Sequence, residues 1–139
     1  MEALTVPLDE ARELFVAQAA EFLAACEALS DLELLDPSRC RGWSRLDLLV
    51  HVRAGLDEMA ADLATPSTAP PDHDAAGYWG SHPDDRDEDV VPHVMWLRRT
   101  ASAYGRPRAA VRHLADSTGR AVAAVTSAAE APSPSRTRC

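Results

Sequence analysis

The chain has 139 residues, which suits one domain and leaves no room for a second hydrophobic core. It carries 14 basic and 22 acidic side chains, and the resulting net charge of −8 argues against a nucleic-acid partner, which clustered basic residues would bind. No apolar run reaches about 18 residues, and the N-terminus lacks a basic or apolar leader. We therefore expect a cytoplasmic protein with no membrane partner.

Two predicted helices account for the first half of the chain. An apolar stripe from Leu8 to Leu29 predicts a helix over residues 7–30. A second stripe predicts a helix over residues 45–64, with Ser44 as its N-cap and Asp47 three residues later in a capping-box arrangement. Cys26 falls on the apolar face of the first helix, so we expect this thiol to be buried rather than reactive.

A long acidic loop is predicted over residues 65–89, because this segment is rich in Pro, Gly and Asp. Loops of this length inside a compact domain are often functional. Its two aromatic residues, Tyr78 and Trp79, have two interpretations that the sequence leaves equal. They form a lid over a small-molecule pocket, or they cover an open end of the core.

The second half of the chain predicts a third helix that is interrupted. It starts near Asp89, breaks or kinks at residues 105–107 because of a Gly and a Pro, and is followed by a further helix to about Ala129. Residues 131–139 have two prolines and no apolar periodicity, so we expect a disordered tail. The bundle domain is accordingly predicted over residues 1–130.

The most specific feature is the loop that leads into the second helix and ends at a histidine. His51 lies on the margin of the apolar stripe of that helix, and Gly55, one turn later, leaves space beside the imidazole. A neutral imidazole that faces the inside of a helical bundle can bind Zn²⁺ or Ni²⁺. We predict that His51 faces the bundle interior, where metal binding is one of two interpretations. The alternative is a core histidine with a hydrogen-bonded neighbour.

This segment resembles the signature of the mycothiol-dependent maleylpyruvate isomerase N-terminal family, within the DinB-like metal-binding bundles. The family pattern Ser-x-Cys-x-Gly-Trp-Ser-x-x-Asp-Leu-x-x-His runs here from Ser38, through Cys40 and Trp43, to His51. The resemblance implies an all-α, DinB-like up-down bundle with long crossover connections, in which His51 is a ligand of a divalent metal and mycothiol is a second cofactor. It further implies isomerase or thiol-transferase chemistry on a small electrophilic substrate. The absence of Lys, Ile and Asn indicates GC-rich coding DNA, which fits an actinobacterial source.

The other two family ligands form a Glu-x-x-x-His pair on a fourth helix, and this chain departs from that pattern. Glu130 is followed by nine residues without a histidine, which would span only about 14 Å even as a helix. We therefore expect a bundle truncated after the third helix, with metal binding that is weak or needs a second chain. His93 is the best substitute ligand nearby, His113 should be solvated, and His73 and His82 lie in the acidic loop.

A different class of function is also consistent with the sequence. A missing fourth helix would expose apolar stripes, and a homodimer would bury them, so the chain would be a non-enzymatic dimerisation or interaction module. The segment Val111–Val125 is the expected contact. A third interpretation is that the chain is a fragment whose function lies in a missing part. Stoichiometric metal would favour the enzyme, and a metal-free obligate dimer would favour the module.

Overall fold

The structure is a computed structural model that describes residues 6–81 and 90–128. These residues form helices, turns and loops, with a single isolated pairing between Pro37 and Ser44. The all-α class is therefore confirmed. The helices are α1 Leu8–Glu27, α2 Asp31–Leu35, α3 Arg45–Ala64, α4 Ala75–Gly80, α5 Val90–Ser102 and α6 Pro107–Ser127.

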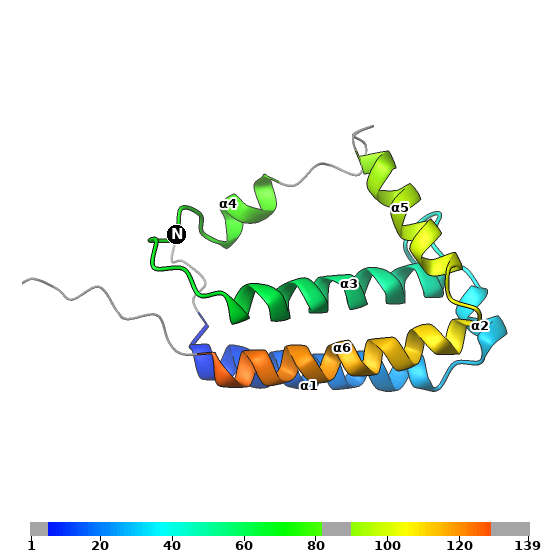
Figure 1. The fold of residues 1–139 in the computed structure, drawn as a ribbon, viewed down its shortest axis with the longest axis horizontal. Coiled ribbons are helices and arrows are strands. Elements are labelled where there is room, and N and C mark those ends of the chain that lie inside the picture. Colours follow the sequence, from blue (N-terminus) through cyan, green and yellow to red (C-terminus); the bar gives the residue numbers. More distant parts are fainter. Residues whose placement is uncertain (1–5, 82–89, 129–139) are drawn as a thin grey trace, which may run out of the picture.

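Three long helices lie side by side, and α6 packs against both α3 and α1 (Figure 1). Helices α3 and α6 run in the same direction, opposite to α1. Their connection must therefore return along the bundle, so the order is a crossover arrangement rather than a simple alternation of up and down. Figure 1 places α4 near the end of α3 and α5 at a steep angle near its start. None of the described helices is both long and apolar enough to cross a bilayer.

The best-packed part of the core lies between α3 and α6. Leu49 and Val50 of α3 and Leu114 and Ala121 of α6 belong to one buried cluster, and each of the four has 0% of its surface exposed. Burial of a leucine or valine side chain contributes about 1.5–3 kcal/mol relative to exposure. This interface therefore fixes the position of α3, the helix that carries His51.

The start of α6 is capped by a residue from a distant part of the chain. Its own N-cap, Arg106, makes no side-chain cap. Instead the Arg108 amide donates to Asp31 Oδ1 at 2.8 Å, and the Arg106 guanidinium bonds the same carboxylate at 2.7 Å. The Arg108 amide, followed by the Arg106 side chain, holds the pKa of Asp31 below its ordinary value of 3.8. The α1–α2 junction is thus tied to the first turn of α6.

Two short helices were not predicted, and both have a visible N-cap. Ser30 forms a capping box with Glu33, and this cap begins α2. Helix α1 ends at Glu27 and not at Ser30 as predicted. The predicted loop of residues 65–89 contains α4, whose N-cap Asp74 accepts the Gly77 amide at 2.7 Å. The bounds predicted for α3 and the break before Pro107 are confirmed. Helices α2 and α4 are too short, with five and six residues, to show an apolar stripe, and α4 lies in a segment whose Pro, Gly and Asp content predicted a loop.

The first part of the expected self-association contact on α6 is covered within the chain, whereas Val122 and Val125 are half-buried. Val111 is 3% exposed and Leu114 is fully buried, because α3 and α1 already cover this face of α6. Cys26 is buried as predicted, and burial raises the pKa of this thiol to about 11. The predicted disordered tail over residues 131–139, Glu130, and the segment 82–89 with His82 lie outside the described residues, so the expected truncation after the third helix is not tested.

Candidate functional site

The signature loop is held by its own hydrogen bonds and delivers Trp43 onto α3. The Ser38 hydroxyl donates to the Trp43 carbonyl at 2.9 Å and accepts the Cys40 amide at 3.1 Å. Gly42 has a φ of +80°, a left-handed conformation that a side chain would strain. Ser44 then forms a capping box with Asp47 at the start of α3. The predicted cap is confirmed, and Trp43 anchors the loop on α3.

Helix α5 is fastened to this loop and to the core at once. The Arg98 guanidinium donates to the Gly42 carbonyl at 2.5 Å. On the inward side of α5, Leu97 is 1% exposed and Ala101 is 2% exposed. These contacts fix the steep angle between α3 and α5 (Figure 1). The first turn of α5, which carries His93, is thereby brought toward the second turn of α3, where His51 lies.

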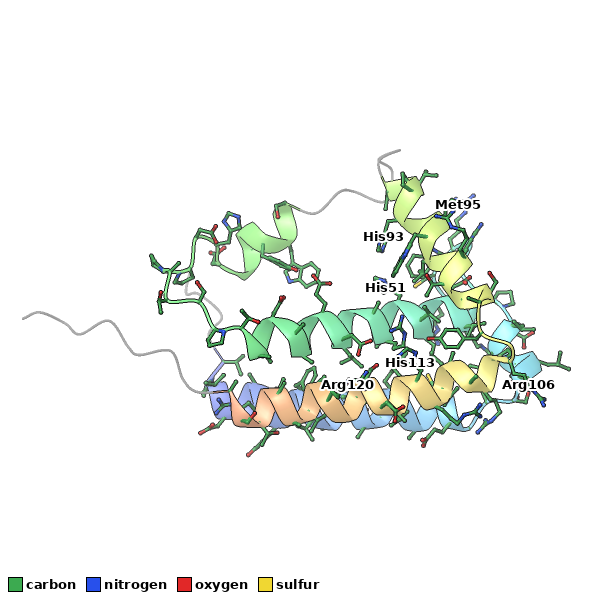
Figure 2. All side chains as sticks on the ribbon, viewed as in Figure 1. His51, His93, Met95, Arg106, His113 and Arg120 are labelled. Atoms are coloured by element: carbon green, nitrogen blue, oxygen red, sulfur yellow. The ribbon has the colours of Figure 1, made fainter. Side chains whose placement is uncertain are left out.

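Four rings from the loop, α3 and α5 form a continuous row, which we call the histidine row. The His51 ring contacts Trp43 edge-on at 5.2 Å between centroids and faces His93 at 6.2 Å. The His93 ring stacks on Trp96 at 5.7 Å with an interplanar angle of 26°. Figure 2 shows the two histidines in the angle between α3 and α5. The structure therefore brings His51 together with His93, the residue predicted to be the best substitute metal ligand nearby.

His51 is less buried than expected. Its ring lies toward His93 of α5, but the residue as a whole is solvent-exposed. Partial desolvation of the ring, followed by the charge of His93, lowers the pKa of His51 below its ordinary value of 6.5. The imidazole is consequently neutral at neutral pH, which is the form that binds a metal ion.

The histidine row supplies two donors for a metal ion. Two imidazoles on one tetrahedral zinc have ring centroids roughly 5 Å apart, given Zn–N bonds of about 2.0 Å. The 6.2 Å between His51 and His93 is close to that spacing. However, in residues 6–81 and 90–128 no group of three or more His, Cys, Asp or Glu side chains could hold a metal ion. The described residues thus fit two positions of such a site and not the three protein ligands of a catalytic zinc.

The other histidines lie apart from this row. His113 was expected to be solvated, and this was wrong: it is half-buried, and its Nδ1 shares a 2.7 Å hydrogen bond with the Tyr104 hydroxyl. The reason is that the linker before α6 folds Tyr104 back onto that helix. His73 is exposed in the segment before α4, where its Nδ1 lies 2.8 Å from the Asp72 carbonyl oxygen.

A polar cluster between α3 and α6 was not predicted from the sequence. Asp57 receives hydrogen bonds from Arg53 at 2.8 Å and from Arg120 at 3.0 Å, and the Arg53 side chain is only 12% exposed. Burial would raise the pKa of Asp57, but hydrogen bonds from Ser117 and Arg120 and the charge of Arg53 hold it below 3.8. The four-residue spacing of Arg53 and Asp57 could have predicted their ion pair from the sequence. The contact of Asp57 with Arg120 could not have been predicted in this way.

A groove of about 500 Å³ runs between α3 and α4. Tyr78 and Trp79 of α4 line one side, with their rings edge to face at 5.2 Å. The opposite side is α3 from Val52 to Leu63, so the groove begins one residue after His51. This groove supports the interpretation that Tyr78 and Trp79 line a small-molecule pocket over the interpretation that they cover an open end of the core.

The chain was then compared with known proteins. The sequence profile of one family, described as mycothiol maleylpyruvate isomerase N-terminal domain, matches residues 15–138. That range covers most of the 139-residue chain and includes both the signature loop and α6. No curated protein and no solved structure was found to match the chain.

Proposed function

The chain belongs to the mycothiol maleylpyruvate isomerase N-terminal domain family, and from this premise we propose that it binds a divalent metal for thiol-dependent chemistry. The thiol would be mycothiol, which the family description names, and the substrate a small electrophile. The reaction would be an isomerisation or a thiol transfer. The observation that carries the proposal is the His51–His93 pair, in which two imidazoles face each other from different helices.

In this proposal each member of the histidine row has a separate task. His51 would be the retained metal ligand, and His93 would be the second donor. Trp43 and Trp96 would hold the two rings and shield them from water on their outer sides. A bound divalent ion would supply a lowered pKa for a thiol that binds to it, which favours the reactive thiolate.

The proposed site has a low expected affinity for a metal ion, because the described residues supply only two protein donors. With two imidazoles and no third protein ligand among the described residues, one chain should bind Zn²⁺ or Ni²⁺ weakly. A second copy of the chain, or residues outside the described ranges, would supply the remaining donors. Weak binding by the isolated chain is therefore part of the proposal.

A second candidate function is favoured by the exposed apolar side chains near the row. Val91, Met95 and Trp96 of α5 are 53%, 44% and 44% exposed, and Met59 and Leu63 of α3 are 38% and 39% exposed. Such a surface would be covered in a homodimer. The chain would then be a non-enzymatic dimerisation module, and its free contacts would lie on α3 and α5 rather than on α6.

Calorimetric titration with Zn²⁺ and Ni²⁺, paired with light scattering of the same sample, tests the proposal. We expect weak binding that falls about 10- to 100-fold in His51→Ala and in His93→Ala. His73→Ala is the matched control, because His73 is an exposed histidine far along the chain from the row. Binding that persists in His51→Ala, or that disappears in His73→Ala, would contradict the proposal. A metal-free dimer would favour the second candidate.

A further inference from the structure

Helix α5 carries His93 on a part of the helix that the core does not hold. His93, Leu97 and Ala101 follow one face of α5 at four-residue spacing, and this face is turned toward α3. Leu97 and Ala101 are buried, but no residue from Val90 to Trp96 is buried. Core packing therefore fixes the second half of α5, while the first half, which carries His93, projects from it.

A hydrogen bond to the signature loop holds α5 from the side. The Arg98 guanidinium donates to the Gly42 carbonyl at 2.5 Å, across 56 residues of sequence. Because Arg98 directly follows Leu97, its side chain leaves the helix about 100° away from the buried residue. A contact in this direction resists a sideways swing of α5, which two buried residues on a single face resist poorly.

The carbonyl that accepts this bond is directed by a tight turn. The Trp43 amide donates to the Cys40 carbonyl at 3.0 Å, which closes a four-residue turn. Within this turn only Gly42 has a positive φ, as at the third position of a type II turn. Glycine adopts this conformation without strain. The turn therefore fixes the direction in which the Gly42 carbonyl points toward α5.

The next residue of the loop contacts the other helix of the histidine pair. The Trp43 ring meets the His51 ring edge-on at 5.2 Å between centroids, and Trp43 also packs against the buried core. Two successive loop residues thus contact both helices: Gly42 is bonded to α5, and Trp43 packs on α3. One short segment of chain sets how α5 lies relative to α3 at this point.

We infer that Arg98 is a positioning residue, which holds His93 opposite His51 through the signature loop. Arg98 acts on the position of α5 and not by contact with a metal ion or a substrate. The inference rests on the proposed function, since the separation of the two imidazoles matters for chemistry where both bind one ion. It gives the Gly-Trp part of the signature a role that the metal ligands alone do not explain.

NMR spectroscopy of the full chain without metal tests this position directly. The ring protons of His51 and His93 should give a nuclear Overhauser effect in the wild type, because the two rings lie edge to face. Arg98→Ala should remove this effect, and Arg98→Lys, which keeps a donor for Gly42, should retain it. Arg99→Ala is the matched control and should also retain it. Arg99 is the neighbouring exposed arginine of α5, and among the described residues its side chain has no hydrogen bond or ion pair.

Calorimetry and denaturation of the same variants give two further measurements. Arg98→Ala should weaken Zn²⁺ binding about 10-fold, as expected for a residue that supports a metal ligand, and Arg98→Lys should restore it. Arg99→Ala should bind Zn²⁺ as the wild type does. Urea denaturation should show little loss of stability in Arg98→Ala, because the bond is exposed and α5 keeps its buried residues.

The measurements separate failure of this inference from failure of the proposed function. A wild type that shows the ring contact but binds no metal refutes the proposed function, and the Arg98→Ala spectrum still decides the inference. A ring contact that persists in Arg98→Ala overturns the inference, whatever the affinity for Zn²⁺. Loss of the contact in Arg99→Ala as well would overturn it too, because the effect would then come from the charge of α5.

A second variant keeps the test decisive if Arg98→Ala does not fold. Gly42→Ala acts from the loop side, because a side chain strains the left-handed conformation that directs the carbonyl. This variant should lose the contact between the His51 and His93 rings. A Gly42→Ala chain that keeps the contact, or a wild type that lacks it, would overturn the inference.

Discussion

Helix α3 has two faces that differ in almost every physical property. The face toward α6 contributes Leu49 and Val50, which are fully buried, and the ion-paired residues Arg53 and Asp57. The face toward α4 and α5 contributes His51, which is solvent-exposed and flanked by rings, and an open groove. The packed face holds α3 in place, and the exposed face carries the candidate site residues.

In this small chain, the residues that stabilise α3 and the residues of the candidate site lie on opposite faces of the same helix. A rigid helix keeps a histidine at a fixed angle to its partner because the opposite side of the same helix is well packed. The exposed side is then free to carry groups that would destabilise a core, such as the exposed carboxylates of Glu58 and Asp62 and the glycine at position 55. Substitutions on the two faces should therefore have different consequences, and the following experiments separate them.

The largest effect should come from Leu114→Ala in the α3–α6 core. Leu114 is fully buried, and its truncation should lower the free energy of unfolding by about 2–5 kcal/mol because it removes apolar burial and leaves a cavity. Met59→Ala on the exposed face is the control and should cost far less. Urea denaturation measures both. Equal losses in the two variants would show that the faces of α3 do not differ in packing.

A smaller loss is expected from Asp57→Asn in the polar cluster. The change keeps the shape of the side chain but leaves the poorly exposed Arg53 guanidinium without its carboxylate, which should cost about 1–3 kcal/mol. Because the pKa of Asp57 is lowered, its contribution is present above pH 3.8 and is lost as the pH falls further. The difference between wild type and Asp57→Asn should therefore shrink in acid. A constant difference down to pH 2 would contradict this account.

The N-terminal cap of α3 should have an effect of about 1 kcal/mol. Ser44→Ala removes the side-chain half of the capping box that begins the helix after the signature loop. Ser30→Ala removes the equivalent bond from α2, which has only five residues and contributes less to the core. Thermal denaturation should rank Ser44→Ala as the more destabilising of the two. The reverse order would mean that α2 and its Asp31 clamp matter more than the start of α3.

The smallest effect should be the pH response of the histidine row, because its rings are partly in solvent and are screened. Because the pKa of His51 is lowered in the folded protein, its contribution to stability is fully present above pH 6.5 and is lost as the pH falls below 6.5 through the lowered pKa. In an NMR titration His51 should change at a pH below 6.5. His93→Gln should move its midpoint upward, because the neighbouring positive charge is gone. An unmoved midpoint would separate the two rings electrostatically.

Much of this protein was determined by the sequence alone. Apolar periodicity predicted the long helices, because one face of each must be buried, and the Ser44–Asp47 spacing fixed the start of α3. The signature from Ser38 to His51 indicated the family that the profile match then showed. These features are local, since each depends on residues within a few turns of one another.

The tertiary structure decided what the sequence left open, because long-range partners have no fixed spacing along the chain. It brought His93 opposite His51, and it supplied Asp31 as the cap of α6 from far along the chain. It also placed His113 half-buried against Tyr104, whereas the sequence had predicted a solvated side chain. A wheel shows which face of a helix a residue occupies. Only the packing of helices shows what that face meets.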